Sequence, residues 1–368
     1  MASRSNRSRV TQLFETLPDS VDVVALSPSE TLRYFTGLNM HKSERPTLLF
    51  LVRDEAPAVV HPVLEGDRIV EALPDAERYT YGDATDPVKA AGKAFEELTD
   101  NRTLSEPIGA EFRSTRLLER EVFAPHGEEV IDVEEAVAAV RSQKDDSEVE
   151  QMRTAVEIIE EIFDEVFELI EPGMSEVDVE TEIKKRVMES EADAYGVGIV
   201  TSGERTAHAH ANTGPRAIED GDFVMIDAGV IYEGYYSDIT RTVAVGEPNP
   251  KLVDIYEVVQ DAASAARDRV EPGVEFQEID RAARTVIEDA GYAEYFPHRV
   301  GHGLGLEGHE PPYLVEGNDG MLEAGHAVTV EPGVYVPDLG GVRIEDDVVV
   351  TEDGSDVLST SSRELRIV

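Results

Sequence analysis

Cysteine is absent from this sequence of 368 residues. Disulfide bonds and thiolate metal sites are therefore excluded. Apolar runs of about 18 residues, which a membrane-spanning helix requires, are also absent. The first seven residues lack the apolar run of a signal peptide. From these absences we expect a soluble, cytoplasmic protein.

Basic side chains are scarce. The chain has 33 lysine and arginine residues against 77 aspartate and glutamate residues, a formal net charge of −44. Nucleic-acid binding needs clustered basic residues to neutralise phosphates, so this partner is not expected. The acidic residues are spread along the whole chain and predict a solvated surface, which is typical of a halophilic protein in a high-salt cytoplasm. An acidic face for a basic partner is the alternative.

The first 140 residues alternate short apolar runs with helical patterns. Strands are expected at 21–26, 47–52, 58–61 and 107–110, and helices at 29–35, 87–98, 114–123 and 133–140. This alternation predicts an α/β domain, and no glycine-rich phosphate loop follows any of its strands. We place the boundary in the polar segment 141–147, so that one domain covers residues 1–140 and a second covers 141–368.

The second domain contains an internal repeat. Residues 221–230 align without gaps with residues 325–334, which matches Asp227 with Glu331. Upstream, the motif Glu-Pro-Gly opens a helical stretch at residue 171 and another at residue 271. Helices are expected at 148–169, 252–270 and 276–290, and strand-rich blocks at 222–245 and 327–350. A repeat of this size indicates one supersecondary unit used twice, with a pseudo-twofold relation between the copies.

Each copy carries two carboxylates in apolar strand sequence. Asp227 and Glu331 follow short apolar runs and are expected at the ends of buried strands, and Asp238 and Glu345 follow downstream. Taken singly, each carboxylate is better interpreted as a buried salt bridge or a strand-end cap. Taken together, four carboxylates that converge on one cleft need cations between them. The set therefore predicts a metal site.

Six of the nine histidines lie between residues 208 and 326. His302 lies in the glycine-rich segment 301–305, which we expect to be a turn whose backbone can approach a ligand closely. One nitrogen and four oxygen ligands without sulfur suit Mn, Co, Fe or Zn better than a structural zinc site. Two such ions would hold a hydroxide at neutral pH and clamp a carbonyl oxygen. His326 is expected at the surface, because it stands at the start of a strand.

In these residues the chain resembles the pita-bread metallopeptidases, a family that includes methionine aminopeptidase, aminopeptidase P, prolidase and creatinase. The five metal ligands of that family match, in order and local context, Asp227, Asp238, His302, Glu331 and Glu345. This resemblance covers residues 141–368. Residues 26–37 resemble the creatinase-type N-terminal domain, which methionine aminopeptidase lacks. The resemblance thus implies an α/β (α+β) fold, with a creatinase-like domain before a pita-bread domain, and the Xaa-Pro branch of the family.

The resemblance also implies how the ligands are shared. Asp227, Asp238 and Glu345 would hold one divalent ion. Asp238, His302, Glu331 and Glu345 would hold the other, so that Asp238 and Glu345 bridge the pair. Glu331 would serve in addition as general base.

Further roles follow from the same resemblance. His210 matches the histidine that hydrogen-bonds the substrate near the scissile bond. His309 matches the one that stabilises the tetrahedral intermediate, and His298 the one that lines the proline pocket. Arg343 and Tyr335 match groups beside the bridging glutamate and the base.

The implied activity is metal-dependent hydrolysis of the N-terminal Xaa-Pro peptide bond by a hydroxide that bridges two divalent ions, with Mn expected first. The substrate would be a small peptide, and a homodimer is implied. Dipeptidase and aminopeptidase activity both stay open, as does a contribution of His208 beside His210. The alternatives are other chemistry on the same scaffold, such as a creatinase-like amidinohydrolase or a lyase, and a non-catalytic relative that binds partners.

Overall fold

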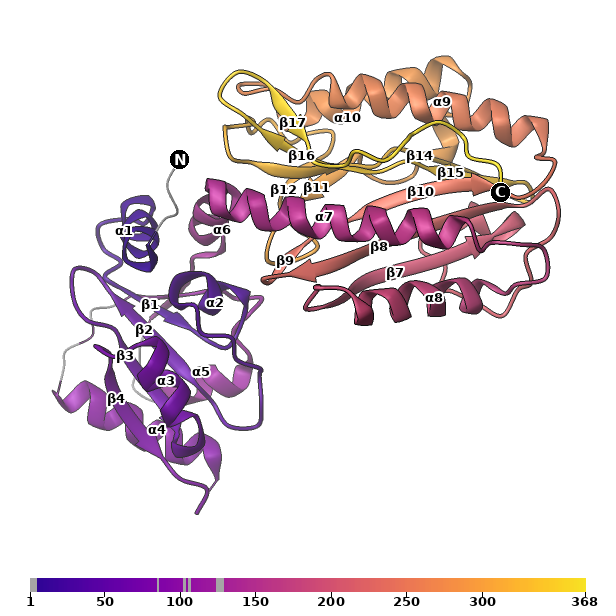
Figure 1. Ribbon diagram of the computed structural model, residues 1–368. Coiled ribbons are helices and arrows are strands. Elements are labelled where there is room, and N and C mark those ends of the chain that lie inside the picture. The colour runs from indigo at the N-terminus through magenta and orange to yellow at the C-terminus, as the bar shows by residue number, and fades with distance from the viewer. Residues whose placement is uncertain (1–4, 85, 102–103, 105–106, 124–128) are drawn as a thin grey trace. The chain divides into compact units, whose positions relative to one another are not determined.

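The computed structural model describes residues 5–84, 86–101, 104, 107–123 and 129–368. The chain forms two compact units, Arg4–Arg141 and Ser142–Val368, both seen in Figure 1. In the described part of the chain, no helix combines the length and the apolar character needed to cross a bilayer.

The first unit is built on a mixed six-stranded sheet with the strand order β4-β3-β2-β1-β5-β6. Its strands are β1 (Val23–Leu26), β2 (Leu48–Val52), β3 (Ala58–Pro62), β4 (Glu77–Tyr81), β5 (Ile108–Ala110) and β6 (Val130–Asp132). Its helices are α1 (Asn6–Thr16), α2 (Glu30–Thr36), α3 (Gly66–Ala72), α4 (Pro87–Asn101), α5 (Leu117–Phe123) and α6 (Glu134–Ser142), with a 3₁₀ turn η1 (Val63–Glu65). Phe50, Phe95 and Phe123 fill the core beside the sheet.

The second unit contains two larger sheets and a hairpin. One sheet has the order β10-β8-β7 with β9 on β8, another has the order β12-β11-β13-β16-β17, and β14 pairs with β15. The first-copy elements are α7 (Asp146–Phe167), α8 (Glu176–Glu189), β7 (Ala194–Ser202), η3 (Gly203–Ala207), β8 (Phe223–Tyr232), β9 (Tyr235–Tyr236) and β10 (Ile239–Ala244). The second-copy elements are α9 (Pro250–Arg267), α10 (Phe276–Asp289), η4 (Ala293–Tyr295), β11 (Gly301–Gly303), β12 (Glu310–Leu314), β13 (Ala327–Val330), β14 (Gly333–Val336), β15 (Gly340–Arg343), β16 (Asp346–Val350) and β17 (Ser355–Val357).

Both copies of the repeat place a pair of helices before their main strands. In the first copy, α7 packs on β8 and α8 packs on β7; in the second, α9 and α10 lie side by side along the strands (Figure 1). A capping box at Asp145 starts α7, and another at Ser175 starts α8. The Glu-Pro-Gly motifs precede α8 and α10 by a short loop, so the expectation that they open the helices is wrong by about one turn.

Candidate metal centre

The five predicted ligands come from strands or from residues next to strands. Asp238 directly precedes β10, Glu331 directly follows β13, and Glu345 lies between β15 and β16. Asp227 lies in the middle of β8, so the prediction of a strand end is wrong there. The strand continues because β7 pairs with it as far as Ile231, and β9 pairs with its last two residues.

Ligand atoms of these side chains converge in overlapping groups. Asp227, Asp238 and Glu345 form one group; His302, Glu331 and Glu345 form a second; and Asp238 and His302 form a third with His309. Within each group the ligand atoms lie within 4.8 Å of one another. His302 Nε2 is 3.5 Å from Glu331 Oε1 and 4.0 Å from Asp238 Oδ2.

His302 lies on strand β11, not in a turn as the glycines suggested. The glycines at 301 and 303 have a different cause, because a Cβ at either position would collide with the backbone oxygen of Thr329 or Pro311. They allow neighbouring strands to approach closely. The Nδ1 atom of His302 lies 3.0 Å from the carbonyl oxygen of Gly303. If Nδ1 carries the proton and donates it there, the lone pair of Nε2 faces the carboxylates.

The electrostatics of the cluster favour a bound cation. Burial, followed by the charges of neighbouring carboxylates, raises the pKa of Asp238 and Glu345 well above the usual range. Burial also raises the pKa of Glu331 to about 7. Burial, with the nearby His309, lowers the pKa of His302 to about 3. Burial thus disfavours the charged carboxylates of the cluster and keeps the His302 imidazole neutral, and divalent ions would compensate the carboxylate charge. The oxygen and nitrogen donors therefore fit divalent metal ions.

Arg343 organises one side of the cluster. Its Nη2 donates to Asp227 Oδ2, its Nε donates to Thr240 Oγ1 at 3.0 Å, and its Nη1 donates to the hydroxyl of Tyr335 at 2.9 Å. Thr240 in turn donates to Glu345 Oε2 at 2.6 Å. One buried guanidinium thus fixes Asp227 directly and Glu345 through Thr240. The contact with Thr240 was not predicted, because it depends on how β10 of the first copy lies against β15 of the second.

The predicted histidines lie around this cluster. His298 Nε2 is 2.9 Å from the hydroxyl of Tyr335, and burial lowers the pKa of His298 to about 4. The ring of His309 stacks on His302 with centroids 3.8 Å apart, and His309 itself is exposed. The packed surroundings of its ring, which lies against His302, lower the pKa of His309 although part of its surface is exposed. These neutral imidazoles can accept or donate hydrogen bonds at neutral pH.

His208 and His210 are both exposed, next to the 3₁₀ turn η3. The carbonyl oxygen of Ala209, between them, accepts a hydrogen bond from Arg343 Nη1 at 3.3 Å. This bond ties the segment to the ligand cluster. After burial and the nearby arginines, His210 is a minor cause of the low pKa of His298 and His309.

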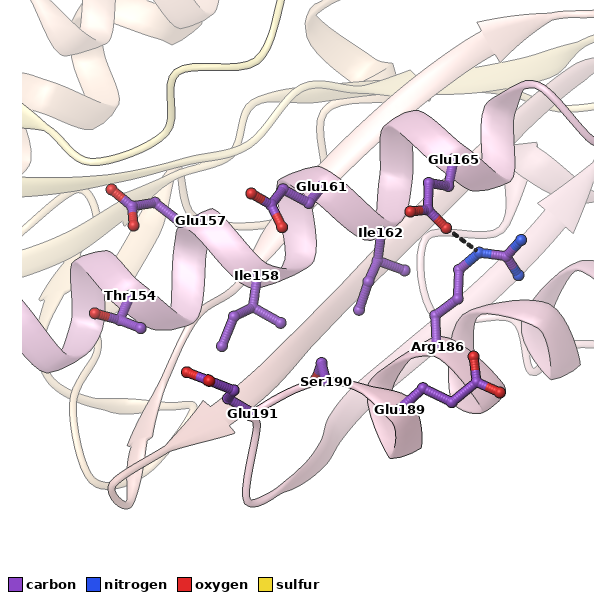
Figure 2. Close-up of a pocket in the computed structure, with 10 residues that line it drawn as sticks. All are labelled: Thr154, Glu157, Ile158, Glu161, Ile162, Glu165, Arg186, Glu189, Ser190 and Glu191. Carbon is purple, nitrogen blue, oxygen red and sulfur yellow. Dashed lines mark hydrogen bonds and ion pairs between the residues drawn. The ribbon is translucent and has the colours of Figure 1, made fainter.

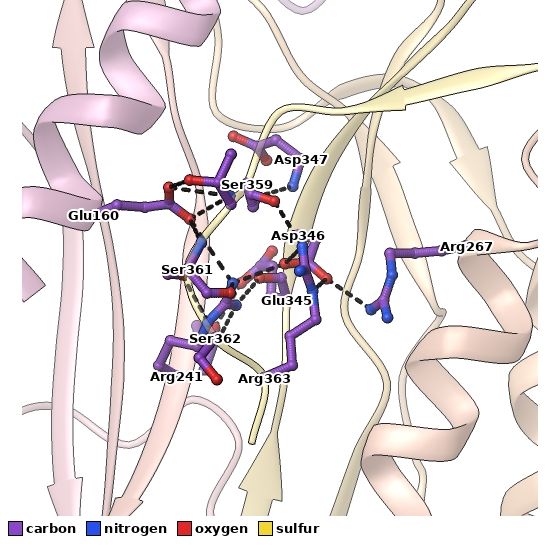
Figure 3. A network of polar contacts seen from close by, with 12 residues as sticks. Glu160, Arg241, Arg267, Glu345, Asp346, Asp347, Ser359, Ser361, Ser362 and Arg363 are labelled. Carbon is purple, nitrogen blue, oxygen red and sulfur yellow. Dashed lines mark hydrogen bonds and ion pairs between the residues drawn. The ribbon is translucent and has the colours of Figure 1, made fainter. Parts of the chain in front are cut away.

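A buried polar network behind Glu345 was missed by sequence reasoning. Asp346 accepts hydrogen bonds from three arginines, with nitrogen–oxygen distances of 2.9 Å to Arg241, 2.7 Å to Arg267 and 2.8 Å to Arg363 (Figure 3). Arg241 also donates to the backbone oxygen of Glu345 at 2.6 Å. The signal in the sequence is the run of three carboxylates at 345–347 before an apolar strand, which burial makes costly without cations.

A second carboxylate of that run supports the site from another direction. Asp347 is buried, and its Oδ2 accepts the backbone N–H of Asp238 at 3.1 Å. Ser359 Oγ accepts the backbone N–H of Asp347 at 2.9 Å. The backbone at Asp238 is thereby tied to Asp347 on β16, and Asp347 is tied to Ser359 of the C-terminal segment. Figure 3 shows Asp347 and Ser359.

His326 is buried, with 7% of its surface exposed, and not at the surface as its position suggested. The residues that enter the second unit cover it, through a bridge with Gln143 and a contact with Ser142 Oγ at 3.4 Å. Its Nδ1 accepts the backbone N–H of Glu323 at 3.2 Å. It is not a member of any ligand group in the described residues.

A cavity of about 430 Å³ lies between α7 and α8, away from these residues (Figure 2). Its lining includes Ile158 and Ile162, and half of its ten lining residues are acidic: Glu157, Glu161, Glu165, Glu189 and Glu191. Arg186 Nε donates to Glu165 at 2.8 Å across it. None of the predicted site residues lines this cavity, and we interpret it as part of the acidic surface.

Comparison with known proteins decides the family. Residues 150–352 match the model of metallopeptidase family M24. The chain belongs to this family. Its members use divalent metal ions, and the chain is accordingly a metallopeptidase.

Relatives match over nearly the whole length. The YkvY protein of Bacillus subtilis is 37% identical over 346 residues, which is 92% of this chain and 93% of the relative. The Xaa-Pro dipeptidase of Lactobacillus delbrueckii subsp. lactis is 34% identical over 358 residues, 95% of this chain and 96% of the relative. The solved structure of the Xaa-Pro dipeptidase from Bacillus anthracis superposes with a TM-score of 0.89 at 32% identity, covering 99% of this chain and all of the other. The α/β fold with a pita-bread unit, predicted from the sequence, is confirmed.

Proposed function

We propose that this metallopeptidase hydrolyses the peptide bond between an N-terminal residue and a following proline. The observation that carries the proposal is the convergence of the five candidate ligands with Arg343 and the two site histidines His298 and His309. The names of the similar Lactobacillus and Bacillus anthracis proteins, both Xaa-Pro dipeptidases, support the choice of substrate.

The ligand groups support a site for two divalent ions. Asp227, Asp238 and Glu345 would hold one ion, and His302 and Glu331 would hold the other with Asp238 and Glu345. When bound, such ions lower the pKa of a shared water to near neutrality, so that it is a hydroxide, and polarise the scissile carbonyl. Manganese is the ion we expect first.

Glu331 is assigned to proton transfer. Its carboxylate would take up the proton that the water loses before it attacks, and this proton would pass to the proline nitrogen as the oxygen–carbon bond forms and the carbon–nitrogen bond breaks. Its Oε1 lies 3.5 Å from His302 Nε2, within the ligand cluster, where a carboxylate can transfer a proton next to the reacting atoms. The products are a free amino acid and a proline with its own amine.

The other residues are assigned to substrate. His309 donates a hydrogen bond to the oxygen on which negative charge develops, and His210 hydrogen-bonds the substrate next to the scissile bond. His298 and Tyr335, which contact each other at 2.9 Å, line the pocket for the proline ring. Proline nitrogen carries no hydrogen, so a shaped pocket must replace the N–H contact that other peptidases use.

We also propose the remaining parts of the assignment. The unit Arg4–Arg141 is a creatinase-type N-terminal domain, and the protein works as a homodimer in a high-salt cytoplasm. The acidic composition supports the last point.

The test uses the full chain, purified at high salt and loaded with manganese or cobalt, with Xaa-Pro dipeptides and longer Xaa-Pro peptides as substrates. Release of the first residue is expected, together with two metal ions per chain by elemental analysis. Asp238→Asn should abolish turnover and lower the metal content, whereas the matched variant Asp356→Asn, at a partly exposed position away from the ligand groups, should change neither. If the metal-loaded protein releases no first residue from any of these substrates, the proposal is wrong.

A further inference from the structure

An ion pair on α10 lies against the chain segment that carries His298. Asp280 and Arg284 are one helical turn apart, and Arg284 Nε donates to Asp280 Oδ2 at 2.6 Å. The carboxylate of Asp280 is completely buried, whereas the side chain of Arg284 is 28% exposed. Burial of a carboxylate is costly, so the pair needs further polar partners to be favourable.

Those partners are backbone groups at alternate residues between η4 and β11. Arg284 Nη1 donates to the carbonyl oxygen of Phe296 at 3.0 Å, and Nη2 donates to that of His298 at 2.6 Å. Asp280 Oδ1 accepts the backbone N–H of Val300 at 2.9 Å. This segment lies outside the helices and strands, so side chains of α10 satisfy and fix its backbone as a neighbouring strand would.

The same guanidinium packs on the ring next to His298. Arg284 Cζ lies 4.4 Å from the centre of the Phe296 ring. The rings of Phe296 and His298 meet nearly at a right angle, at 87°, with centroids 5.0 Å apart. Arg284 therefore holds His298 in two ways, through the backbone carbonyl and through the stacked ring of Phe296.

Both ring nitrogens of His298 are bonded within the protein. Nδ1 lies 2.8 Å from the carbonyl oxygen of Arg299, which can only accept, so Nδ1 carries the proton. Nε2 lies 2.9 Å from the hydroxyl of Tyr335 and accepts its hydrogen bond, and the Tyr335 oxygen in turn accepts one from Arg343. A neutral ring agrees with the pKa of about 4 that burial gives His298. A substrate thus meets the apolar surface of this ring, and the position of the ring decides the contact.

Proline is a residue that such a surface can select. Its nitrogen carries no hydrogen, so a pocket distinguishes it from alanine through the additional carbons of its ring. Discrimination by apolar contact is lost when the wall of the pocket moves away from those carbons. Alanine does not reach that wall, and its cleavage depends less on where the wall lies.

We propose that Arg284, paired with Asp280, is a positioning residue of the proline pocket, which fixes His298 where its ring selects proline over smaller residues. This inference rests on the proposed function and adds a residue that determines its specificity. Arg284 acts through His298 and not through the ligand cluster, so the metal content should not depend on it.

The experiment compares the dipeptides Ala-Pro and Ala-Ala, using the metal-loaded full chain. The wild type should cleave Ala-Pro with the higher kcat/KM. In Arg284→Met the ratio of the two kcat/KM values should fall roughly 10-fold or more, the range for a lost methylene contact in an apolar pocket. Arg284→Lys keeps the charge beside Asp280 but lacks the planar fork that reaches two carbonyl oxygens, so it should restore part of the ratio.

A double-mutant cycle separates positioning from general stability. Because Arg284 acts through His298, Arg284→Met should lower the ratio no further in a His298→Ala background. Arg186 provides the matched control: it donates to Glu182, four residues before it, at 2.6 Å, and its side chain is 18% exposed. Its other acidic partner is Glu165 on α7. Arg186→Met should therefore leave the ratio as in the wild type.

Binding of free proline and free alanine supplies a readout without turnover. By calorimetry, the wild type should bind proline more tightly than alanine, and Arg284→Met should bind the two with similar affinity at unchanged metal content. Circular dichroism checks the fold of each variant. Where Arg284→Met does not fold, Arg284→Lys and Asp280→Asn carry the same comparison, with a smaller fall in the ratio expected for both.

The outcomes distinguish this inference from the proposed function. An unchanged ratio in the Arg284 variants, or losses that add in the double variant with His298→Ala, would overturn the assignment of Arg284 and leave the proposed function standing. An equal fall of the ratio in Arg186→Met would overturn it too, because a general loss of stability would then explain both. A wild type that cleaves neither dipeptide would overturn the proposed function as well.

Discussion

Replacing Asp346 by asparagine should destabilise the second unit more than any exposed substitution. The carboxylate of Asp346 is fully buried and contacts three guanidinium groups, whose side chains are 4% (Arg241), 14% (Arg267) and 24% (Arg363) exposed. These contacts lower the pKa of Asp346 although burial alone would raise it. Asparagine keeps the shape and one acceptor oxygen but removes the charge that balances the arginines.

The magnitude follows from the contacts that remain. Each charge-assisted hydrogen bond is worth about 1.5–3 kcal/mol, but the three share one acceptor group and do not add. Arg241 keeps its bonds to the backbone oxygens of Thr240 and Glu345, and Arg363 keeps its bond to Ser359. Removing one partner of a buried ion pair costs about 3–5 kcal/mol, and we expect about 3 kcal/mol because these other bonds persist.

Urea denaturation at constant high salt, followed by circular dichroism, measures this effect. Guanidinium chloride is unsuitable because it changes ionic strength. With an m-value of about 3 kcal/mol/M, the midpoint should fall by about 1 M. The matched variant Asp356→Asn removes a partly exposed pair with Arg153, whose side chains are 28% (Arg153) and 48% (Asp356) exposed, and should change stability by less than about 0.5 kcal/mol. Equal midpoints for the two variants would refute the reasoning.

Three further results are expected. Burial lowers the pKa of His326 to about 4, so the unfolded chain binds a proton that the folded chain excludes as pH falls below about 6.5. When the pH falls from 7 to 5, the free energy of unfolding should therefore decrease by about 2 kcal/mol more in the wild type than in His326→Gln, as urea denaturation measures. An identical pH dependence of the two proteins would contradict this. Lys144→Met leaves Glu310 buried without its 2.6 Å partner. This variant should lower the free energy of unfolding by about 3 kcal/mol. In a double-mutant cycle, the double variant with Glu310→Gln should lose less stability than the sum of the losses in the two single variants. The thermal midpoint should rise with KCl concentration because salt screens the repulsion among acidic side chains, and a salt-independent midpoint would argue against a halophilic surface.

Local patterns in the sequence predicted much of the fold. A single carboxylate after an apolar run is a weak signal, but the gapless repeat located this signal twice, at Asp227 and Glu331. The helix expected at 148–169 was within a few residues of α7, because apolar residues recur at helical spacing there. The edge strands β4 and β6 were missed, because one alternates polar residues and the other has only three residues.

The features that the sequence did not predict depend on pairing between distant segments, which no local sequence pattern reveals. His302 is on a strand because β12 and β13 pair with β11 on its two sides. His326 is buried because residues far away in sequence cover it. The charge balance of Asp346 and the contact of Arg299 with Tyr313 both join segments whose register only the folded chain fixes.

The two copies of the repeat are alike in their carboxylates and differ in their imidazoles. His302 lies as many residues before Glu331 as Gly198, on β7, lies before Asp227, so the first copy offers no imidazole at that position. His298 and His309 also belong to the second copy, whereas the first copy supplies the exposed His208 and His210. Each copy thus adds two carboxylates to the cluster, and within the described residues only the second copy adds an imidazole to the ligand groups. Repetition supplies the carboxylates that would hold the ions, and the departure from repetition supplies the nitrogen ligand.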